Sequence, residues 1–146
     1  MEEGMSLLEY LKKEFSCEEV DIRGYSPLAL AYIGDCIYDM IIRSVVVARG
    51  NTSAAKLHKR TSELVNAGTQ ARLVESVQDL LTEEEEAVYR RGRNAKSHTT
   101  AKNASVLDYR KATGLEALLG YLYLKEEMVR AVELVKTGME RIEKTL

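Results

Sequence analysis

Two long apolar segments dominate the pattern of hydrophobic and polar positions along the chain. Residues 26–48 read SPLALAYIGDCIYDMIIRSVVVA, and residues 112–124 read ATGLEALLGYLYL. In the first segment Ser26 is a favourable N-cap, Pro27 suits the first helical position, and Arg49-Gly50-Asn51 ends the pattern. We therefore predict a helix over each segment. Because so few of its side chains are polar, the first helix should be buried on most sides, at the centre of the fold.

Shorter amphipathic patterns predict helices over much of the remaining chain. They cover residues 5–15, a stretch from Thr52 or Ser53 to about Leu80 that breaks at Asn66-Ala67-Gly68, a helix that begins at Thr82, the chain from Val106 onward, and a last helix from about Glu126 to Ile142. Thr82 and Glu85 have the spacing of a capping box. The helix that they begin ends within residues 90–97, and residues 94–104 have no helical periodicity. We predict a basic surface loop there.

Composition agrees with an all-α fold. The 146 residues are 45% hydrophobic, enough for one domain with a core, and they include a single proline. With no repeat or linker, residues 1–146 are expected to form one domain. The net charge of −2 argues against a general polycation, but residues 90–111 hold seven Lys or Arg against one Asp. That segment is a candidate contact for a polyanion.

Neither the cysteines nor the N-terminus indicates secretion or a membrane. Cys17 and Cys36 are too few for a disulfide framework or a metal cluster, and Cys36 falls inside the first apolar helix, so both are expected to be reduced thiols. The N-terminus is acidic and lacks the apolar core of a signal peptide. The longest apolar helix carries two Asp and one Arg, which argues against a membrane span. We expect a soluble, cytoplasmic protein.

Two acids on the apolar helices lack a partner in their own helix. Asp35 and Glu116 have no cation three or four positions away, whereas Asp39 has Arg43 four residues later and is expected to pair with it. A buried carboxylate without a partner either becomes neutral or meets a positive charge from elsewhere. The sequence thus predicts that something positive reaches Asp35 and Glu116.

One cation shared by both acids is the interpretation that we favour. Gly34 and Gly120, close to the two acids in sequence, would let two helix backbones approach closely. An all-oxygen site suits Mg²⁺ or Mn²⁺, and Mg²⁺ can activate water for attack on a phosphodiester. The alternative is that each acid caps a neighbouring helix or pairs with an Arg of another segment. It explains either acid alone, whereas both acids together with a basic loop favour the metal.

Several motifs, in order, resemble the ribonuclease III family. Residues 31–39, AYIGDCIYD, are similar to its signature helix, and residues 115–124, LEALLGYLYL, are similar to its second catalytic helix. The resemblance covers roughly residues 26–130. It narrows to Mini-ribonuclease III, the short bacterial form without a separate double-stranded-RNA-binding domain, over LALAYIGD (28–35), LHK (57–59), EEEEAV (83–88) and RGRNAKS (91–97).

The resemblance implies an all-α homodimer that cleaves double-stranded RNA with Mg²⁺, or with Mn²⁺ as a substitute. For the Mini form it implies maturation of 23S ribosomal RNA precursor ends, and it leaves open whether a ribosomal protein presents the substrate. The family's catalytic acids fall on Asp35 and Glu116, which would be metal ligands. The longer enzymes carry two further acids where this chain has Ala31 and Thr113. We therefore expect one tightly held Mg²⁺, with water or RNA phosphate completing its coordination.

Two further residues are secondary candidates for the site. Thr113 could hold a metal-bound water, but a helical Thr more often bonds its own backbone, and we expect that bond. Asp39 is expected to belong to Arg43 or to a dimer interface. His58 and His98 have no clustered partners, so we do not expect histidine general-base chemistry.

The basic residues supply the expected RNA contacts, with an ordinary solvated surface as the alternative. Phosphate and ribose contacts of this kind are salt-dependent, and duplex shape should matter more than base identity. The candidates are Arg91, Arg93, Lys96, Lys102 and Asn103, with Lys59 and Arg60 as a weaker second patch.

Dimerisation also follows from the first apolar helix itself. It is apolar around too much of its circumference for a small domain to cover, and two-fold pairing is the commonest remedy. A two-fold axis would place two copies of the site against one duplex. The competing function is a non-catalytic helical dimer that binds structured RNA or a protein partner. In such a protein Asp35 and Glu116 would be structural.

Overall fold

The structure is a computed structural model that describes residues 3–96 and 105–146. Within these residues the chain forms seven α-helices and two short 3₁₀ helices, without any strand, so the all-α prediction is confirmed. None of the helices in these two ranges is long and apolar enough to cross a membrane. The α-helices are α1 (Leu7–Glu14), α2 (Pro27–Ala48), α3 (Ala54–Ser62), α4 (Ala67–Ser76), α5 (Glu83–Asn94), α6 (Val106–Leu124) and α7 (Met128–Arg141), and the 3₁₀ helices are η1 (Ile22–Gly24) and η2 (Gln78–Leu80).

Local capping explains where most of the helices begin. Before each α-helix except α7, a side-chain oxygen accepts a hydrogen bond from the backbone N–H three residues later, which satisfies a donor that the helix leaves unpaired. The predicted capping box of Thr82 and Glu85 is present with both of its hydrogen bonds. The six capping residues are Ser6, Ser26, Ser53, Asn66, Thr82 and Ser105.

Helix α5 ends at Asn94, within residues 90–97 as predicted, so Arg91 and Arg93 lie on its last turn. Of the basic loop predicted over residues 94–104, residues 97–104 lie outside the described residues. The last turn of α5 packs on α6: Gly92 is buried, and a Cβ added to it would lie only 2.6 Å from the Cβ of Ala117 on α6. Close contact with α6 thus holds the last turn of α5 in place.

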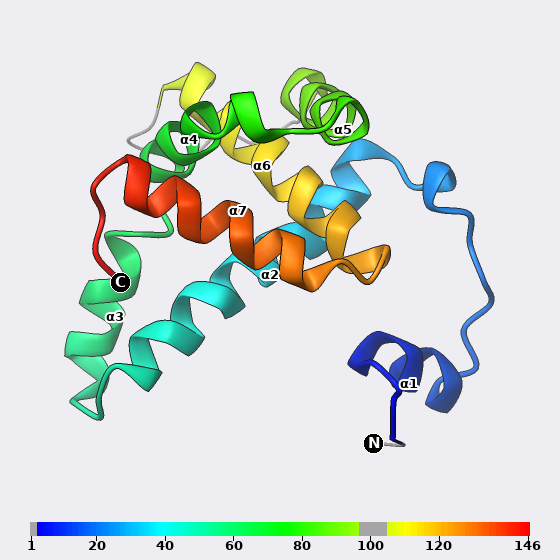
Figure 1. The fold of residues 1–146 in the computed structure, drawn as a ribbon, viewed down its shortest axis with the longest axis horizontal. Helices are drawn as coiled ribbons and strands as arrows, with labels where there is room; N and C mark the ends of the chain where they lie inside the picture. Colours follow the sequence, from blue (N-terminus) through cyan, green and yellow to red (C-terminus); the bar gives the residue numbers. More distant parts are fainter. Residues whose placement is uncertain (1–2, 97–104) are drawn as a thin grey trace.

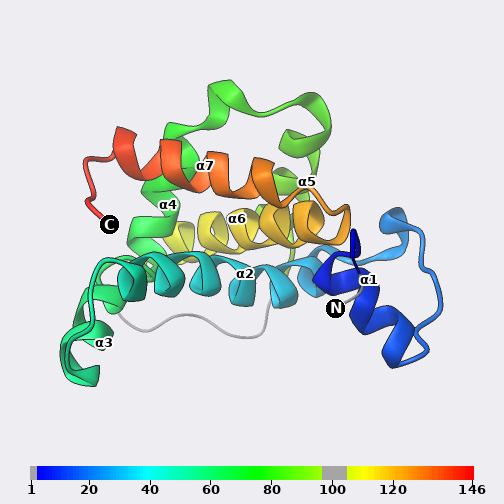
Figure 2. The ribbon, with the colours of Figure 1, turned by 60° about the horizontal axis from the view of Figure 1, so that its bottom comes forward.

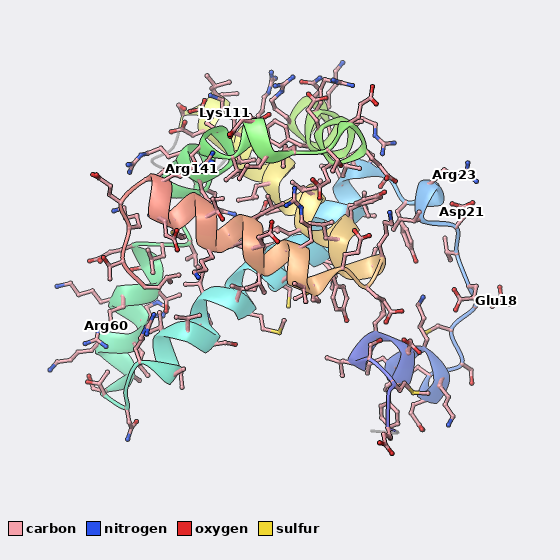
Figure 3. All side chains as sticks on the ribbon, in the orientation of Figure 1. Glu18, Asp21, Arg23, Arg60, Lys111 and Arg141 are labelled. Atoms are coloured by element: carbon pink, nitrogen blue, oxygen red, sulfur yellow. The ribbon has the colours of Figure 1, made fainter. Side chains whose placement is uncertain are left out.

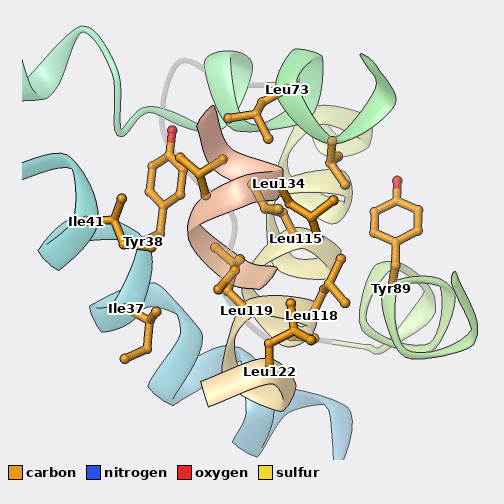
Figure 4. Close-up of a cluster of buried hydrophobic side chains, with 14 of the residues drawn as sticks. Ile37, Tyr38, Ile41, Leu73, Tyr89, Leu115, Leu118, Leu119, Leu122 and Leu134 are labelled. Carbon is orange, nitrogen blue, oxygen red and sulfur yellow. The ribbon is translucent and has the colours of Figure 1, made fainter. Parts of the chain in front are cut away.

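Helix α6 lies at the centre of the molecule. It packs against α2, α4, α5 and α7, and Figure 2 shows it between α2 and α7. Ten of its 19 residues are buried. Its side chains supply much of the core drawn in Figure 4, together with residues of the surrounding helices. The labelled core residues are Leu115, Leu118, Leu119 and Leu122 of α6, Ile37, Tyr38 and Ile41 of α2, Leu73 of α4, Tyr89 of α5 and Leu134 of α7.

Helix α2 is the longest helix, but in the single chain it is buried on one side only. Eight of its 22 residues are buried, while Tyr32 is 84% exposed and Met40 43% exposed. The prediction that this helix is buried on most sides was therefore wrong for one chain. Cys36, expected inside the core, is likewise exposed. The reason is that α6 covers only one face of α2, while α3 lies at the C-terminal end of α2 and α1 stands apart from it (Figure 1).

The backbones of α2 and α6 meet at a pair of glycines. A Cβ added to Gly34 would lie 1.6 Å from the carbonyl oxygen of Glu116, and one added to Gly120 would lie 2.0 Å from the carbonyl oxygen of Leu30. No other residue fits at either place. The predicted close approach of the two helices is confirmed, and it places Asp35 beside the helix that carries Glu116.

Helix α7 is tied to the start of α5 by an ion pair. Arg130 donates to both oxygens of Glu85 at 2.9 Å and to the carbonyl oxygen of Leu80 at 2.7 Å. The guanidinium lowers the pKa of Glu85, although burial opposes the shift. The Glu85 side chain is only 5% exposed. Through the capping box and the bonds from Arg130, this buried acid both caps α5 and joins it to α7.

Candidate metal centre

Asp35 and Glu116 open onto one cleft between α2 and α6. The cleft has a volume of about 750 Å³ and is lined by both acids. Asp35 reaches it from the first half of α2, and Glu116 reaches it from the middle of α6. The remaining lining residues are Leu28, Ala31, Tyr32, Ile33, Cys36, Tyr38, Asp39, Val65, Tyr109 and Thr113.

The two acids differ in exposure. Asp35 is exposed and Glu116 is half-buried. Helix α2 was expected to place a carboxylate in the interior of the domain or in an interface. In the single chain Asp35 is not in the interior, so an interface is the alternative that stays a prediction. Burial and the nearby Asp35 raise the pKa of Glu116 to about 8, and the amide of Gln70 opposes the shift. Two carboxylates held together in this way favour a cation between them.

The donor set fits a hard divalent cation. Within residues 3–96 and 105–146, neither acid forms an ion pair with Lys, Arg or His. Carboxylate oxygens are ligands that Mg²⁺ and Mn²⁺ prefer. No group of three or more His, Cys, Asp or Glu side chains is found in the same two ranges. A cation held here would therefore take only two side-chain ligands from the described residues, and water or substrate oxygens would have to supply the rest.

Ala31 and Thr113, the two positions where the resemblance would place further acids, also lie in this cleft. Both line it and are buried, so these positions belong to the same site. The hydroxyl of Thr113 donates to the carbonyl oxygen of Tyr109 at 3.0 Å, as predicted for a helical threonine. Asp39 accepts hydrogen bonds of 2.9 and 3.0 Å from Nε of Arg43, which confirms the predicted pair.

Gln70 contacts the site and was missed in the sequence. Its Nε2 lies 3.4 Å from Oε2 of Glu116, although the two residues are 46 positions apart. The sequence held one signal. Gln70 lies three and four residues before the buried Leu73 and Val74, so it shares their core-facing side of α4. A polar side chain on that face must find a partner.

The basic residues of α5 lie beside α6. Arg91 and Arg93 flank Gly92, which packs against Gly114 and Ala117 on either side of Glu116. The guanidinium of Arg93 lies 5.5 Å from the centre of the Tyr89 ring.

The remaining candidates for RNA contact differ in where they lie relative to the cleft. Arg91 and Lys96 are exposed and form no ion pair with another described residue. Lys59 and Arg60 are exposed on the last turn of α3, beyond the far end of α2 from Asp35, and Figure 3 shows Arg60 at that edge of the molecule. Lys102, Asn103 and His98 lie outside the described residues.

Comparison with known proteins identifies the family to which this chain is similar. A family model described as the ribonuclease III domain matches residues 28–127. A Mini-ribonuclease 3 of Clostridium tetani is 45% identical over 128 residues, which is 87% of this chain and 83% of that protein. One of Enterococcus faecalis is 46% identical over 127 residues, covering 86% and 96%. A crystal structure of a protein from Fusobacterium nucleatum superposes with a TM-score of 0.76 and 30% identity, covering 84% of this chain and 99% of that one.

Proposed function

Because the chain belongs to the ribonuclease III family and, within it, to the Mini-ribonuclease III group, it is an endoribonuclease, and we propose that it cleaves double-stranded RNA with Mg²⁺ held by Asp35 and Glu116. The family acts on double-stranded RNA and implies a divalent metal. The observation that carries the proposal for this chain is the meeting of these two acids in one cleft without a cationic side chain between them.

The two acids have complementary roles in this proposal. Glu116 is fixed on the most buried helix and positions the cation, while the exposed Asp35 lies where a substrate can reach it. Without a cation, Glu116 keeps its proton near neutral pH because its pKa is raised to about 8. A divalent cation favours loss of that proton. When bound, Mg²⁺ supplies an activated water for attack on a phosphodiester, and Mn²⁺ has the same ligand preference.

The RNA backbone is proposed to contact the basic end of α5. Arg91 and Lys96 are exposed and have no competing ion pair among the described residues, and Arg93 is held against Tyr89. The proposal extends to Lys102 and Asn103, and more weakly to Lys59 and Arg60. Such contacts read the phosphate backbone rather than the bases.

A homodimer is part of the same proposal. The outer face of α2 carries an apolar stripe, defined as Leu28, Tyr32, Cys36 and Met40, which recur every four residues and are all exposed. A second copy could cover this stripe by two-fold pairing and bring a second cleft to the same duplex.

The proposed cellular role rests on the resemblance to Mini-ribonuclease III that the sequence motifs carry. On that resemblance we propose maturation of 23S ribosomal RNA precursor ends in the cytoplasm, with residues 1–146 acting as one catalytic domain and a ribosomal protein as a candidate partner for presenting the substrate. The competing function, a helical dimer that binds RNA or protein without cleavage, is set aside because the chain belongs to a family of endoribonucleases.

A cleavage assay tests the proposed site. A long RNA duplex is incubated with the purified protein in Mg²⁺ and then in EDTA. We expect metal-dependent cleavage, abolished in Asp35→Asn and in Glu116→Gln, because each change removes one of two carboxylate ligands.

The matched control is Glu140→Gln, which removes one exposed carboxylate on α7 and should cleave like the unmodified protein. Circular dichroism and light scattering establish that the variants keep their fold and assembly. Normal cleavage by Asp35→Asn or Glu116→Gln would refute the assigned site, and their unfolding would mark the acids as structural.

A further inference from the structure

Gln70 is a buried polar residue whose side chain contacts Glu116. It is only 4% exposed, and its Nε2 donates to Oε2 of Glu116 across 3.4 Å. A buried amide without a hydrogen-bond partner would destabilise the fold, so an apolar residue would be the ordinary occupant of this position. The presence of an amide here therefore needs an explanation. Its contact with Glu116, the proposed metal ligand, suggests one.

The other buried hydroxyl groups beside the cleft are already committed elsewhere. The hydroxyl of Tyr38 donates to the carbonyl oxygen of Leu64 at 2.6 Å, and burial, with a smaller effect of the nearby Glu116, raises the pKa of this tyrosine. The hydroxyl of Thr113 donates to the carbonyl oxygen of Tyr109. Among the described residues, the amide of Gln70 is thus the donor that the fold directs at the Glu116 carboxylate.

Gln70 is held firmly on its own helix. Asn66 caps α4 by accepting from the backbone N–H of Thr69, and the hydroxyl of Thr69 donates to the carbonyl oxygen of Glu63 at 3.1 Å. Helix α4 also packs directly against α6. The amide therefore approaches Glu116 from a rigid support. A donor on one carboxylate oxygen restricts rotation of the group and leaves the other oxygen for a cation.

We propose that Gln70 is a positioning residue: its amide orients the Glu116 carboxylate toward the cation shared with Asp35. This inference rests on the proposed function, and it assigns a role to a residue of α4, a helix that supplies no metal ligand. In metal sites generally, the hydrogen-bond partners of the ligands orient them, and loss of such a partner costs about 10–100-fold in metal affinity.

The decisive variant is Gln70→Met, which keeps the length of the side chain but removes the amide. Isothermal titration with Mn²⁺ in the absence of RNA measures metal affinity directly. We expect the dissociation constant to rise by about 10-fold or more. Cleavage of duplex RNA should need correspondingly more Mg²⁺ and should recover at saturating Mg²⁺, because Gln70 does not touch the RNA in this proposal. Duplex binding in EDTA should not change.

Thr69→Val is the matched control, since it also removes a buried hydrogen bond from α4 but one that does not reach the cleft. It should lower the melting temperature while keeping the Mn²⁺ affinity. If Gln70→Met fails to fold, Gln70→Asn decides, because its amide is one carbon too short to reach Glu116 and should weaken Mn²⁺ binding as well.

The outcomes separate this inference from the proposed function. If the unmodified protein binds Mn²⁺ and Glu116→Gln does not, but the folded Gln70 variants bind it normally, the positioning role is wrong and the metal site stands. An equal loss of Mn²⁺ affinity in Thr69→Val would also overturn the positioning role. If the unmodified protein binds no Mn²⁺, the metal site fails and the inference fails with it.

Discussion

Glu116 is a carboxylate whose surroundings oppose its charge. It is half-buried on a helix with apolar neighbours, and Asp35 adds a second negative group nearby. Gln70 compensates in part, but the pKa of Glu116 still rises to about 8. Without a cation, the folded protein therefore holds a proton on Glu116 that the unfolded chain loses at much lower pH. Metal binding requires the ionised form of Glu116, and ionising this side chain in the folded protein without a cation lowers the free energy of unfolding.

The variant Glu116→Gln should change how the free energy of unfolding depends on pH. Between pH 4.5, the ordinary pKa, and about pH 8, the folded state keeps the proton and the unfolded state does not, so the contribution of Glu116 to stability falls as pH rises. We expect Glu116→Gln in EDTA to match the unmodified protein near pH 4.5 and to exceed it by about 2 kcal/mol at pH 8, with allowance for partial exposure.

Urea unfolding at the two pH values measures the difference. Glu140→Gln, an exposed acid, should show no such pH-dependent gain. Addition of Mn²⁺ at pH 8 should stabilise the unmodified protein and narrow the difference. A constant difference between the two proteins at both pH values would contradict the raised pKa.

At the scale of the elements, the crossing of α2 and α6 decides the geometry of the site. Gly34 and Gly120 let the two backbones touch, and Gly34 meets the carbonyl group of Glu116 itself. The spacing between the two acids therefore depends on the absence of a side chain at these positions. A change that separates the helices would displace Glu116 from Asp35 as well as weaken the core.

Gly34→Ala should be strongly destabilising for this reason. The added Cβ would lie 1.6 Å from backbone that cannot move without shifting α6, so we expect a loss of about 3 kcal/mol or more. Gly68→Ala is the control, because its Cβ would meet only side-chain oxygens, of Asn66 at 3.4 Å and Asp108 at 3.9 Å, and alanine favours a helix. Chemical denaturation should find Gly68→Ala within about 1 kcal/mol of the unmodified protein. Equal effects of the two changes would refute the close crossing.

For the whole molecule, the apolar stripe on α2 is the feature that one chain leaves unexplained. Tyr32 and Met40 are large and exposed, and α3 lies at the C-terminal end of α2 without covering the stripe (Figure 1). Exposed apolar surface of this kind is a common mark of an interface. The proposed homodimer would cover the stripe, and it would explain why a helix with so few polar residues carries an exposed face.

Met40→Glu tests the dimer, because it places a charge within the proposed interface without touching the cleft. We expect the unmodified protein to be a dimer at micromolar concentration and Met40→Glu to be a monomer, as measured by size-exclusion chromatography with light scattering. Val129→Glu on α7 introduces the same charge at an equally apolar residue that is 83% exposed, and it should stay dimeric. A monomeric unmodified protein, or a dimeric Met40→Glu, would count against the interface.

The sequence by itself determined the helices and the chemistry that they carry. Ser26 and Thr82 mark helix starts because a cap acts on the backbone within three residues. Asp39 found Arg43 because four residues make one helical turn. Asp35 and Glu116 stood out because neither has such a neighbour. All of these interactions are local, so the order of residues is enough to read them.

Only the tertiary structure decided how those parts meet. It placed α6 rather than α2 at the centre, packed the last turn of α5 on α6 at Gly92, and left Asp35 exposed in the single chain. It also joined Gln70 to Glu116 across 46 positions of sequence. Contacts between distant segments depend on which face of each helix is covered, and amphipathic patterns alone do not assign the partner.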